Sequence, residues 1–192
     1  MVGFIGADLV LSNPKTDGQI TIPITSGTGI GGGTWSTARD ESGCVVVERG
    51  LAASTAVEYF IMPVTVLHRT AAGKGVRLKS VTVAYSLDGG DADADTLDFY
   101  ITKQIIPKNG IAPSGTILAG DDSADYDSGH DSAGERLANG DHTLTVTIPA
   151  GERAYLGDGD QLWLMIKIAD AADGDLVFTL KGAVANVDVL MF

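Results

Sequence analysis

Residues 141–148 read DHTLTVTI, and in this stretch Leu144, Val146 and Ile148 alternate with three threonines. A period of two places the apolar side chains on one face of an extended strand and the threonines on the other. Residues 97–102 (LDFYIT) and 176–181 (LVFTLK) repeat this alternation. We therefore expect a protein built from strands that are buried on one face and solvated on the other.

Nine segments have strand-like patterns, and turn dipeptides such as Asn-Gly and Asp-Gly separate them. They are residues 20–25, 44–48, 57–68, 76–87, 97–104, 142–148, 161–169, 175–181 and 184–190. No window shows a helical period. A chain of 192 residues suits one domain. The sequence thus predicts an all-β, antiparallel β-sandwich of the jelly-roll type, with about 8–9 strands and almost no helix.

The alternation changes phase once within a strand. Val76 and Leu78 have one parity, whereas Val81 and the apolar residues after it have the other. An extra residue in one strand restores a single buried face, because a one-residue shift turns every later side chain over. We predict a β-bulge near Lys79 and Ser80.

Residues 57–67 and 161–169 are apolar on both faces of the predicted strand. A strand in a two-layer sandwich needs only one buried face, so the second face must contact something else. A covering loop and a neighbouring subunit are the two alternatives, and we favour the subunit. The predicted interface residues are Trp163, Met165, Phe60 and Met62.

The N-terminal part differs in composition. Residues 26–43 (SGTGIGGGTWSTARDESG) are rich in glycine, so we divide the chain into an N-terminal arm with a short strand (1–43) and a jelly-roll domain (44–192). Gly27, Gly29 and Gly32 have the spacing of a dinucleotide-binding fingerprint. No helix start or βαβ unit follows them, so we interpret the segment as an arm or strap between subunits.

Charge and cysteine content exclude several classes of function. The net charge is −12, from 25 acidic and 13 basic residues, and such a field repels nucleic acid. Cys44 is the only cysteine, which excludes an internal disulfide, and we expect it to be a buried small apolar residue. No stretch reaches the roughly 20 apolar residues of a membrane span, and no secretory signal is evident. We expect assembly in a cytoplasm.

Clustered carboxylates suggest a calcium site. Asp91, Asp93 and Asp95 have the oxygen spacing that opens a calcium-binding loop, but the glycine and the final glutamate of an EF-hand are missing. A looser structural Ca²⁺ site and a solvated hairpin remain as alternatives, and no other cofactor is expected. A second acidic segment, residues 120–140, is predicted to be a long loop of the kind that is functional or mobile.

No catalytic motif is present, so we do not expect an enzyme. His68, His130 and His142 occur outside any zinc-protease or hydrolase signature. A pair of carboxylates for glycoside hydrolysis is a generic alternative in any acidic β-protein.

The segments 141–151 (DHTLTVTIPAG) and 156–164 (LGDGDQLWL) resemble the strand–turn–strand cadence of jelly-roll proteins on tailed-phage particles. The resemblance covers about residues 57–190. It implies a capsid decoration or head-fibre protein of the virion, assembled in the host cytoplasm. It also implies homotrimers and contacts with the major capsid protein. It supplies no catalytic residues.

The main interpretation is therefore a self-associating structural protein of a bacteriophage particle. The alternative is a carbohydrate-binding or receptor-binding module that uses exposed aromatic residues such as Trp35, Tyr126 or Tyr155.

Overall fold

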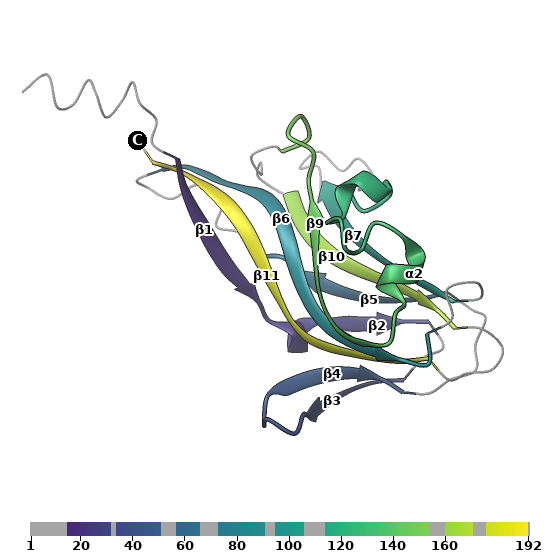
Figure 1. Cartoon of the computed structure of the whole chain (residues 1–192). Helices are drawn as coiled ribbons and strands as arrows, with labels where there is room; N and C mark the ends of the chain where they lie inside the picture. Colours follow the sequence, from purple (N-terminus) through teal and green to yellow (C-terminus); the bar gives the residue numbers. More distant parts are fainter. Residues whose placement is uncertain are drawn as a thin grey trace, which may run out of the picture.

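The computed structural model describes residues 15–31, 34–50, 57–65, 73–90, 95–105, 114–153, 160–170 and 176–191. These residues form eleven strands in two antiparallel sheets (Figure 1). Sheet A consists of β3 (Trp35–Arg39), β4 (Val45–Arg49), β11 (Val177–Met191), β6 (Gly73–Asp88) and β9 (Gly140–Thr147), and β1 (Lys15–Ile22) also pairs with β11. Sheet B consists of β2 (Thr28–Ile30), β5 (Glu58–Pro63), β10 (Asp160–Ala169), β7 (Thr96–Ile105) and β8 (Ser114–Ala119).

The order of the strands is that of a jelly roll. Within the sandwich, β4-β11-β6-β9 faces β5-β10-β7-β8. From β4 to β11 the chain changes sheets at every connection except β7 to β8, which are neighbours in sheet B. The predicted all-β sandwich is confirmed. The described helices are short: η1 (Ile24–Ser26), η2 (Ser123–Asp125) and α2 (Ala133–Arg136). Among the described residues, no helix is long and apolar enough to cross a bilayer.

Several strand boundaries differ from the predicted ones. Residues 177–181 and 184–190, predicted to lie in two strands, belong to one strand, β11, because a register shift between Leu180 and Gly182 lets the ladder continue through the glycine. Strands β2, β3 and β8 were not predicted, since most of their residues are exposed and carry no buried alternation. The predicted bulge is confirmed: Leu78 pairs with Val187 and Ser80 with Asn186, which leaves Lys79 as the extra residue.

Residues 15–31 and 34–39, which lie in the predicted N-terminal arm, contribute three strands to the two sheets. Strand β1 pairs with β11 and β3 with β4 in sheet A, whereas β2 pairs with β5 in sheet B. Glycine allows this close approach, because a Cβ on Gly27 would lie 2.3 Å from Phe60 and one on Gly29 would lie 2.2 Å from Trp35. The glycines thus let the backbone of residues 27–29 pack directly against the Phe60 and Trp35 side chains.

The core lies between the sheets and has an aromatic centre. Tyr85 packs against Phe99 and Phe178, with ring centroids 5.2 and 5.6 Å apart. Trp35 stacks on Phe60 at 4.5 Å and extends this layer toward the N-terminal strands. Cys44 is exposed, contrary to the prediction, because it lies in the turn before β4, where its N–H bonds the Asp40 carboxylate.

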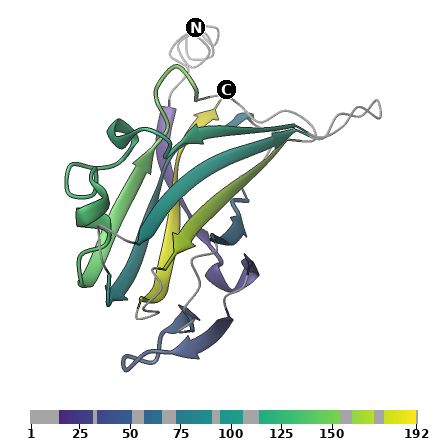
Figure 2. The same ribbon diagram turned by 90° about the vertical axis from the view of Figure 1, so that its right-hand side faces the viewer.

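A folded segment, residues 120–138, packs beside the sandwich and is called the cap below (Figure 2). It contains η2 and α2, and α2 begins with a capping box between Ser132 and Glu135. Tyr126 is buried, and its hydroxyl bonds the backbone of Phe99 and Gly120. The acidic loop predicted at 120–140 is therefore an ordered element held by its own polar residues.

Candidate functional site

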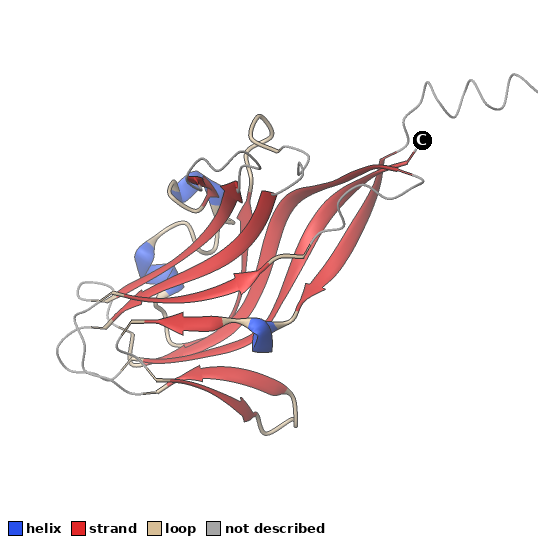
Figure 3. Cartoon of the chain, turned by 180° about the vertical axis from the view of Figure 1, so that it is seen from behind, coloured by secondary structure: helices blue, strands red, loops and turns tan. Residues whose placement is uncertain are grey.

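The outer face of sheet B carries large side chains in register. Along β10, Leu162, Leu164 and Ile166 point into the core, so Trp163 and Met165 point outward. The ladder places Trp163 between Pro63 of β5 and Thr102 of β7. The next row holds Ile61, Met165 and Tyr100, and the third holds Tyr59, Lys167 and Asp98. Sheet B lies behind sheet A in Figure 1 and in front of it in Figure 3.

An open hollow of about 550 Å³ occupies this face. Its size is within the range of small-ligand sites. Apolar side chains form most of its lining, and three hydroxyl groups contribute the polar part. The lining residues are Ser26, Thr28, Ile30, Ile61, Pro63, Thr102, Trp163 and Met165.

Trp163 has an unsatisfied polar atom. Its Nε1 is buried and makes no hydrogen bond within the described part of the chain. A buried donor without an acceptor costs about 1–3 kcal/mol. This cost is removed only where an oxygen acceptor comes within hydrogen-bond distance of Nε1.

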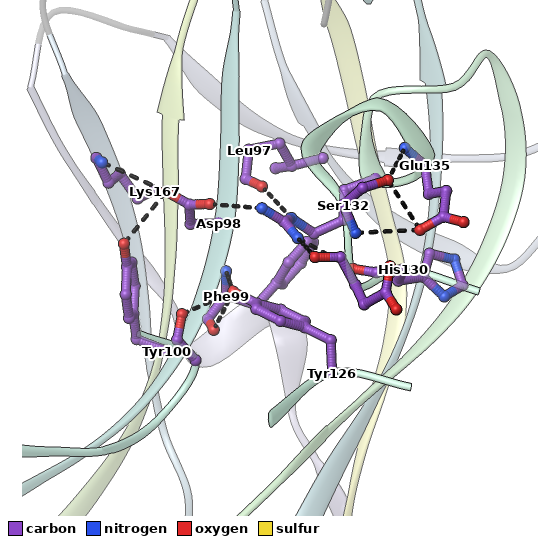
Figure 4. Close-up of polar contacts among 12 residues, drawn as sticks. Leu97, Asp98, Phe99, Tyr100, Tyr126, His130, Ser132, Glu135 and Lys167 are labelled. Atoms are coloured by element: carbon purple, nitrogen blue, oxygen red, sulfur yellow. Dashed lines mark hydrogen bonds and ion pairs between the residues drawn. The ribbon is translucent and has the colours of Figure 1, made fainter. Parts of the chain in front are cut away.

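A polar cluster lies at the other end of the same face (Figure 4). The Asp98 carboxylate accepts hydrogen bonds from Arg136 of the cap, Lys167 and the Tyr100 hydroxyl, at 3.1, 3.3 and 3.2 Å. Burial and the neighbouring Asp98 charge raise the pKa of Tyr100, so this phenol stays protonated. The cluster fixes the cap to the edge of the face.

The predicted interface residues divide between two faces. Trp163 and Met165 lie on the outer face, whereas Phe60 and Met62 are 3% and 0% exposed and belong to the core. The alternation on β5 assigns the outward positions to Tyr59, Ile61 and Pro63 instead. Both parities of β5 are apolar, so hydrophobicity alone did not distinguish its inward face from its outward face.

The aromatic residues of the carbohydrate-binding alternative do not form an exposed set. Trp35 packs on Phe60 and Phe178, and Tyr126 is buried beside Phe99. Tyr155 lies outside the described residues. The hydroxyls of Thr28 and Thr102 were missed, because exposed threonines are common on strands. Only the strand register places Thr102 beside Trp163 and Thr28 in the lining of the same hollow.

The predicted calcium ligands are described only in part. Asp91 and Asp93 lie outside the described residues, and Asp95 is buried immediately before β7. Within the described ranges, no three His, Cys, Asp or Glu side chains are grouped so that they could hold a metal ion. The carboxylates of Asp122 and Asp125 accept backbone N–H groups in the cap. These side chains stabilise the local fold.

Comparisons with known proteins concern architecture alone. No family model and no curated sequence matches the chain. A xylan-binding module, CBM15, is 13% identical with a TM-score of 0.49, covering 91% of this chain and 97% of the module. A family 11 carbohydrate-binding module from Clostridium thermocellum is 7% identical with a TM-score of 0.40 and coverages of 91% and 96%.

One matched structure comes from a phage. The enzymatically active domain of bacteriophage CBA120 tailspike protein 4 is 11% identical with a TM-score of 0.38, and the match covers 92% of this chain but 20% of that one. At these identities and scores the likeness is limited to a general arrangement of strands. Nothing about the function of this chain follows from it, and the resemblance to phage-particle proteins stays a prediction.

Proposed function

We propose that this chain is a non-catalytic binding module that holds a neutral polysaccharide against the outer face of sheet B. The observation that carries the proposal is the open hollow whose lining combines Trp163 with the hydroxyl residues Ser26, Thr28 and Thr102. Sugar rings present C–H groups on their faces and hydroxyls at their edges. An indole with hydroxyl neighbours is complementary to both.

The dimensions of the face favour a chain of sugars over a single one. Five strands at about 4.8 Å spacing make a surface about 20 Å wide, which exceeds the length of one monosaccharide. The net charge of −12 disfavours polyanionic polysaccharides such as those rich in uronic acids. A neutral polysaccharide is the ligand class that fits both features.

The lining favours binding over turnover. Hydrolysis of a glycoside requires two carboxyl groups on either side of the bond that breaks. The described residues that line the hollow include hydroxyl and apolar side chains but no carboxylate or histidine. The chemistry available there is stacking and hydrogen bonding.

Electrophoresis in native gels that contain a neutral polysaccharide tests the proposal. We expect at least one such polysaccharide to retard the protein. Trp163→Ala is expected to weaken binding about 30-fold, the size of a hot-spot loss of about 2 kcal/mol, whereas Trp163→Phe keeps a ring and most of the affinity. Thr143, exposed on β9 of sheet A, provides a matched control as Thr143→Val. Equal retardation of the wild type and Trp163→Ala would overturn the proposal.

A second candidate is a structural protein of a virus particle, in which the same face contacts another subunit. The observation that favours it is the aliphatic rim of sheet B, where Ile30, Ile105 and Ile117 are 53, 37 and 41% exposed. Sedimentation distinguishes the candidates. A trimer dissociated by Ile117→Asp supports the particle protein, and a monomer that binds polysaccharide supports the module.

A further inference from the structure

Two histidines connect the cap to sheet A through a chain of hydrogen bonds. Asp127 Oδ1 lies 2.8 Å from His130 Nδ1, and His130 Nε2 lies 3.2 Å from His142 Nδ1. His142 Nε2 in turn lies 2.6 Å from the carbonyl oxygen of Ala138. His130 belongs to the cap and His142 to β9, so the contact between the rings fastens one to the other.

The groups at both ends of this series of hydrogen bonds are acceptors. They determine which outer ring nitrogens carry a proton. The carbonyl of Ala138 can only accept, so His142 Nε2 carries a hydrogen. The Asp127 carboxylate also accepts the N–H groups of Gly129 and Thr145, at 3.1 and 2.5 Å. Burial opposes ionisation of Asp127, but these bonds and the one from His130 lower its pKa below 3.8. It is ionised near neutral pH, and His130 Nδ1 also carries a hydrogen.

The two inner nitrogens, His130 Nε2 and His142 Nδ1, face each other, and the outer protons leave both of them without a hydrogen when the rings are neutral. If both rings were neutral, His130 Nε2 and His142 Nδ1 would each present a lone pair to the other at 3.2 Å. A cation between the two nitrogens removes this repulsion. A proton shared as N–H···N and a metal ion are the two candidates.

The orientation of the rings favours the proton. The ring centroids lie 5.4 Å apart, close to the largest separation that a 3.2 Å N···N contact permits, so the two lone-pair axes point almost straight at each other. Linear geometry suits a hydrogen bond. Zinc ligands converge on the ion at a tetrahedral angle, which would bring the rings closer together, and structural zinc sites use four protein ligands.

We infer that His130 and His142 bind one proton as a pair, and that this proton fastens the cap to β9. The inference is independent of the proposed function. The imidazolium charge is compensated by Asp127, and the pair is partly shielded, since the side chain of His130 is 12% exposed. Tyr85 of β6 stacks on the His142 ring at 4.7 Å.

Other charged groups surround the pair. Asp131, Glu135 and Arg136 come from the cap, and the Arg136 guanidinium donates to the carbonyl of His130. Asp141 adjoins His142 on β9 and is paired with Lys181 of β11.

The proton makes the contact dependent on pH. Loss of the shared proton would place the two nitrogen lone pairs face to face at 3.2 Å, and this repulsion would weaken the contact between the cap and β9. After release, one ring must turn away and lose its bond to Asp127 or Ala138. We expect the cap to loosen in alkaline solution while the sandwich stays folded.

Nitrogen-15 NMR of the imidazole rings tests the inference. The variant His68→Gln is used, because His130 and His142 are then the only histidines in the chain. Between about pH 5 and pH 8, the range in which histidine changes charge, we expect three nitrogen-bound protons on the two rings and then the loss of one in a single coupled step. In His142→Gln we expect His130 to lose its proton independently of any second ring. We also expect the denaturation midpoint to depend less on pH over the same range.

Two results would overturn the inference. One is independent titration of the two rings, with the His130 curve unchanged in His142→Gln. The other is stoichiometric binding of Zn²⁺ that EDTA reverses and His142→Gln removes, since the pair would then be a metal site.

Discussion

Arg49 and Glu58 form a bidentate ion pair inside the protein. Arg49 Nε lies 3.1 Å from Oε2 and Nη2 lies 3.2 Å from Oε1, and both side chains are fully buried. Arg49 also bonds Asp170 and the carbonyl of Leu176. Burial disfavours the guanidinium charge, but the hydrogen bonds and charges of Glu58 and Asp170 raise its pKa overall. The cluster joins β4 of sheet A to β5 of sheet B.

Replacing Arg49 by leucine leaves buried carboxylates without their cation. We expect a loss of about 3–5 kcal/mol in the free energy of unfolding, measured by urea denaturation. Lys181→Ala is the matched control, because its pair with Asp141 is exposed and contributes at most about 1 kcal/mol. Similar losses for both variants would show that the buried pair does not hold the sheets together.

Gly29→Ala tests the position of β2. The added Cβ would lie 2.2 Å from the Trp35 ring, so we expect about 1–3 kcal/mol of destabilisation from overpacking. The control is Gly182→Ala in β11, where a Cβ meets nothing within 4 Å. A stable Gly29→Ala variant with unchanged Trp fluorescence would contradict the packing of the β2 backbone against Trp35.

Tyr126→Phe tests how the cap is attached. The change removes the hydroxyl that bonds the backbone of Phe99 and Gly120, and we expect a loss of about 1–3 kcal/mol in the thermal or chemical unfolding of the protein. Tyr59→Phe, on the outer face of sheet B, should stay within about 0.5 kcal/mol of the wild type. Equal effects would argue against a buried hydroxyl in the cap.

Asp127 also makes the stability of the cap depend on pH in the acidic range. Its pKa is lowered below 3.8 by hydrogen bonds that outweigh its burial, so its contribution is present above the pKa of the unfolded chain and disappears as the pH falls through the folded pKa. We expect Asp127→Asn to destabilise the protein at neutral pH and to converge with the wild type in acid. Asp141→Asn, at an exposed site, should show little difference at any pH.

Hydroxyl groups of the hollow should contribute to ligand binding. Thr102→Val keeps the shape of the side chain and removes one hydrogen-bonding group beside Trp163, so we expect about a 2- to 10-fold loss of affinity with unchanged stability. Isothermal titration with the polysaccharide that retards the wild type measures it. Unaltered affinity in both Thr102→Val and Thr28→Val would remove the hydroxyls from the proposed site.

Alternation predicted the fold class because burial of one face imposes a period of two. Leu144 and Val146 are fully buried, as expected, and the bulge at Lys79 followed from a change of parity. Alternation gave no answer where both parities are apolar, which is why Phe60 was placed on the wrong face. It also failed for exposed strands such as β3, which are held by backbone pairing that leaves no hydrophobic pattern.

The sequence by itself determined an all-β sandwich, its approximate strands and the absence of an internal disulfide, because these depend on local periodicity and on composition. Only the tertiary structure decided which groups meet. Trp163 approaches Thr102, Arg49 pairs with Asp170, and His130 contacts His142 through strand pairing and packing between separate segments. Such contacts depend on register and on the path of the chain between the sheets, and periodicity along one segment carries no information about either.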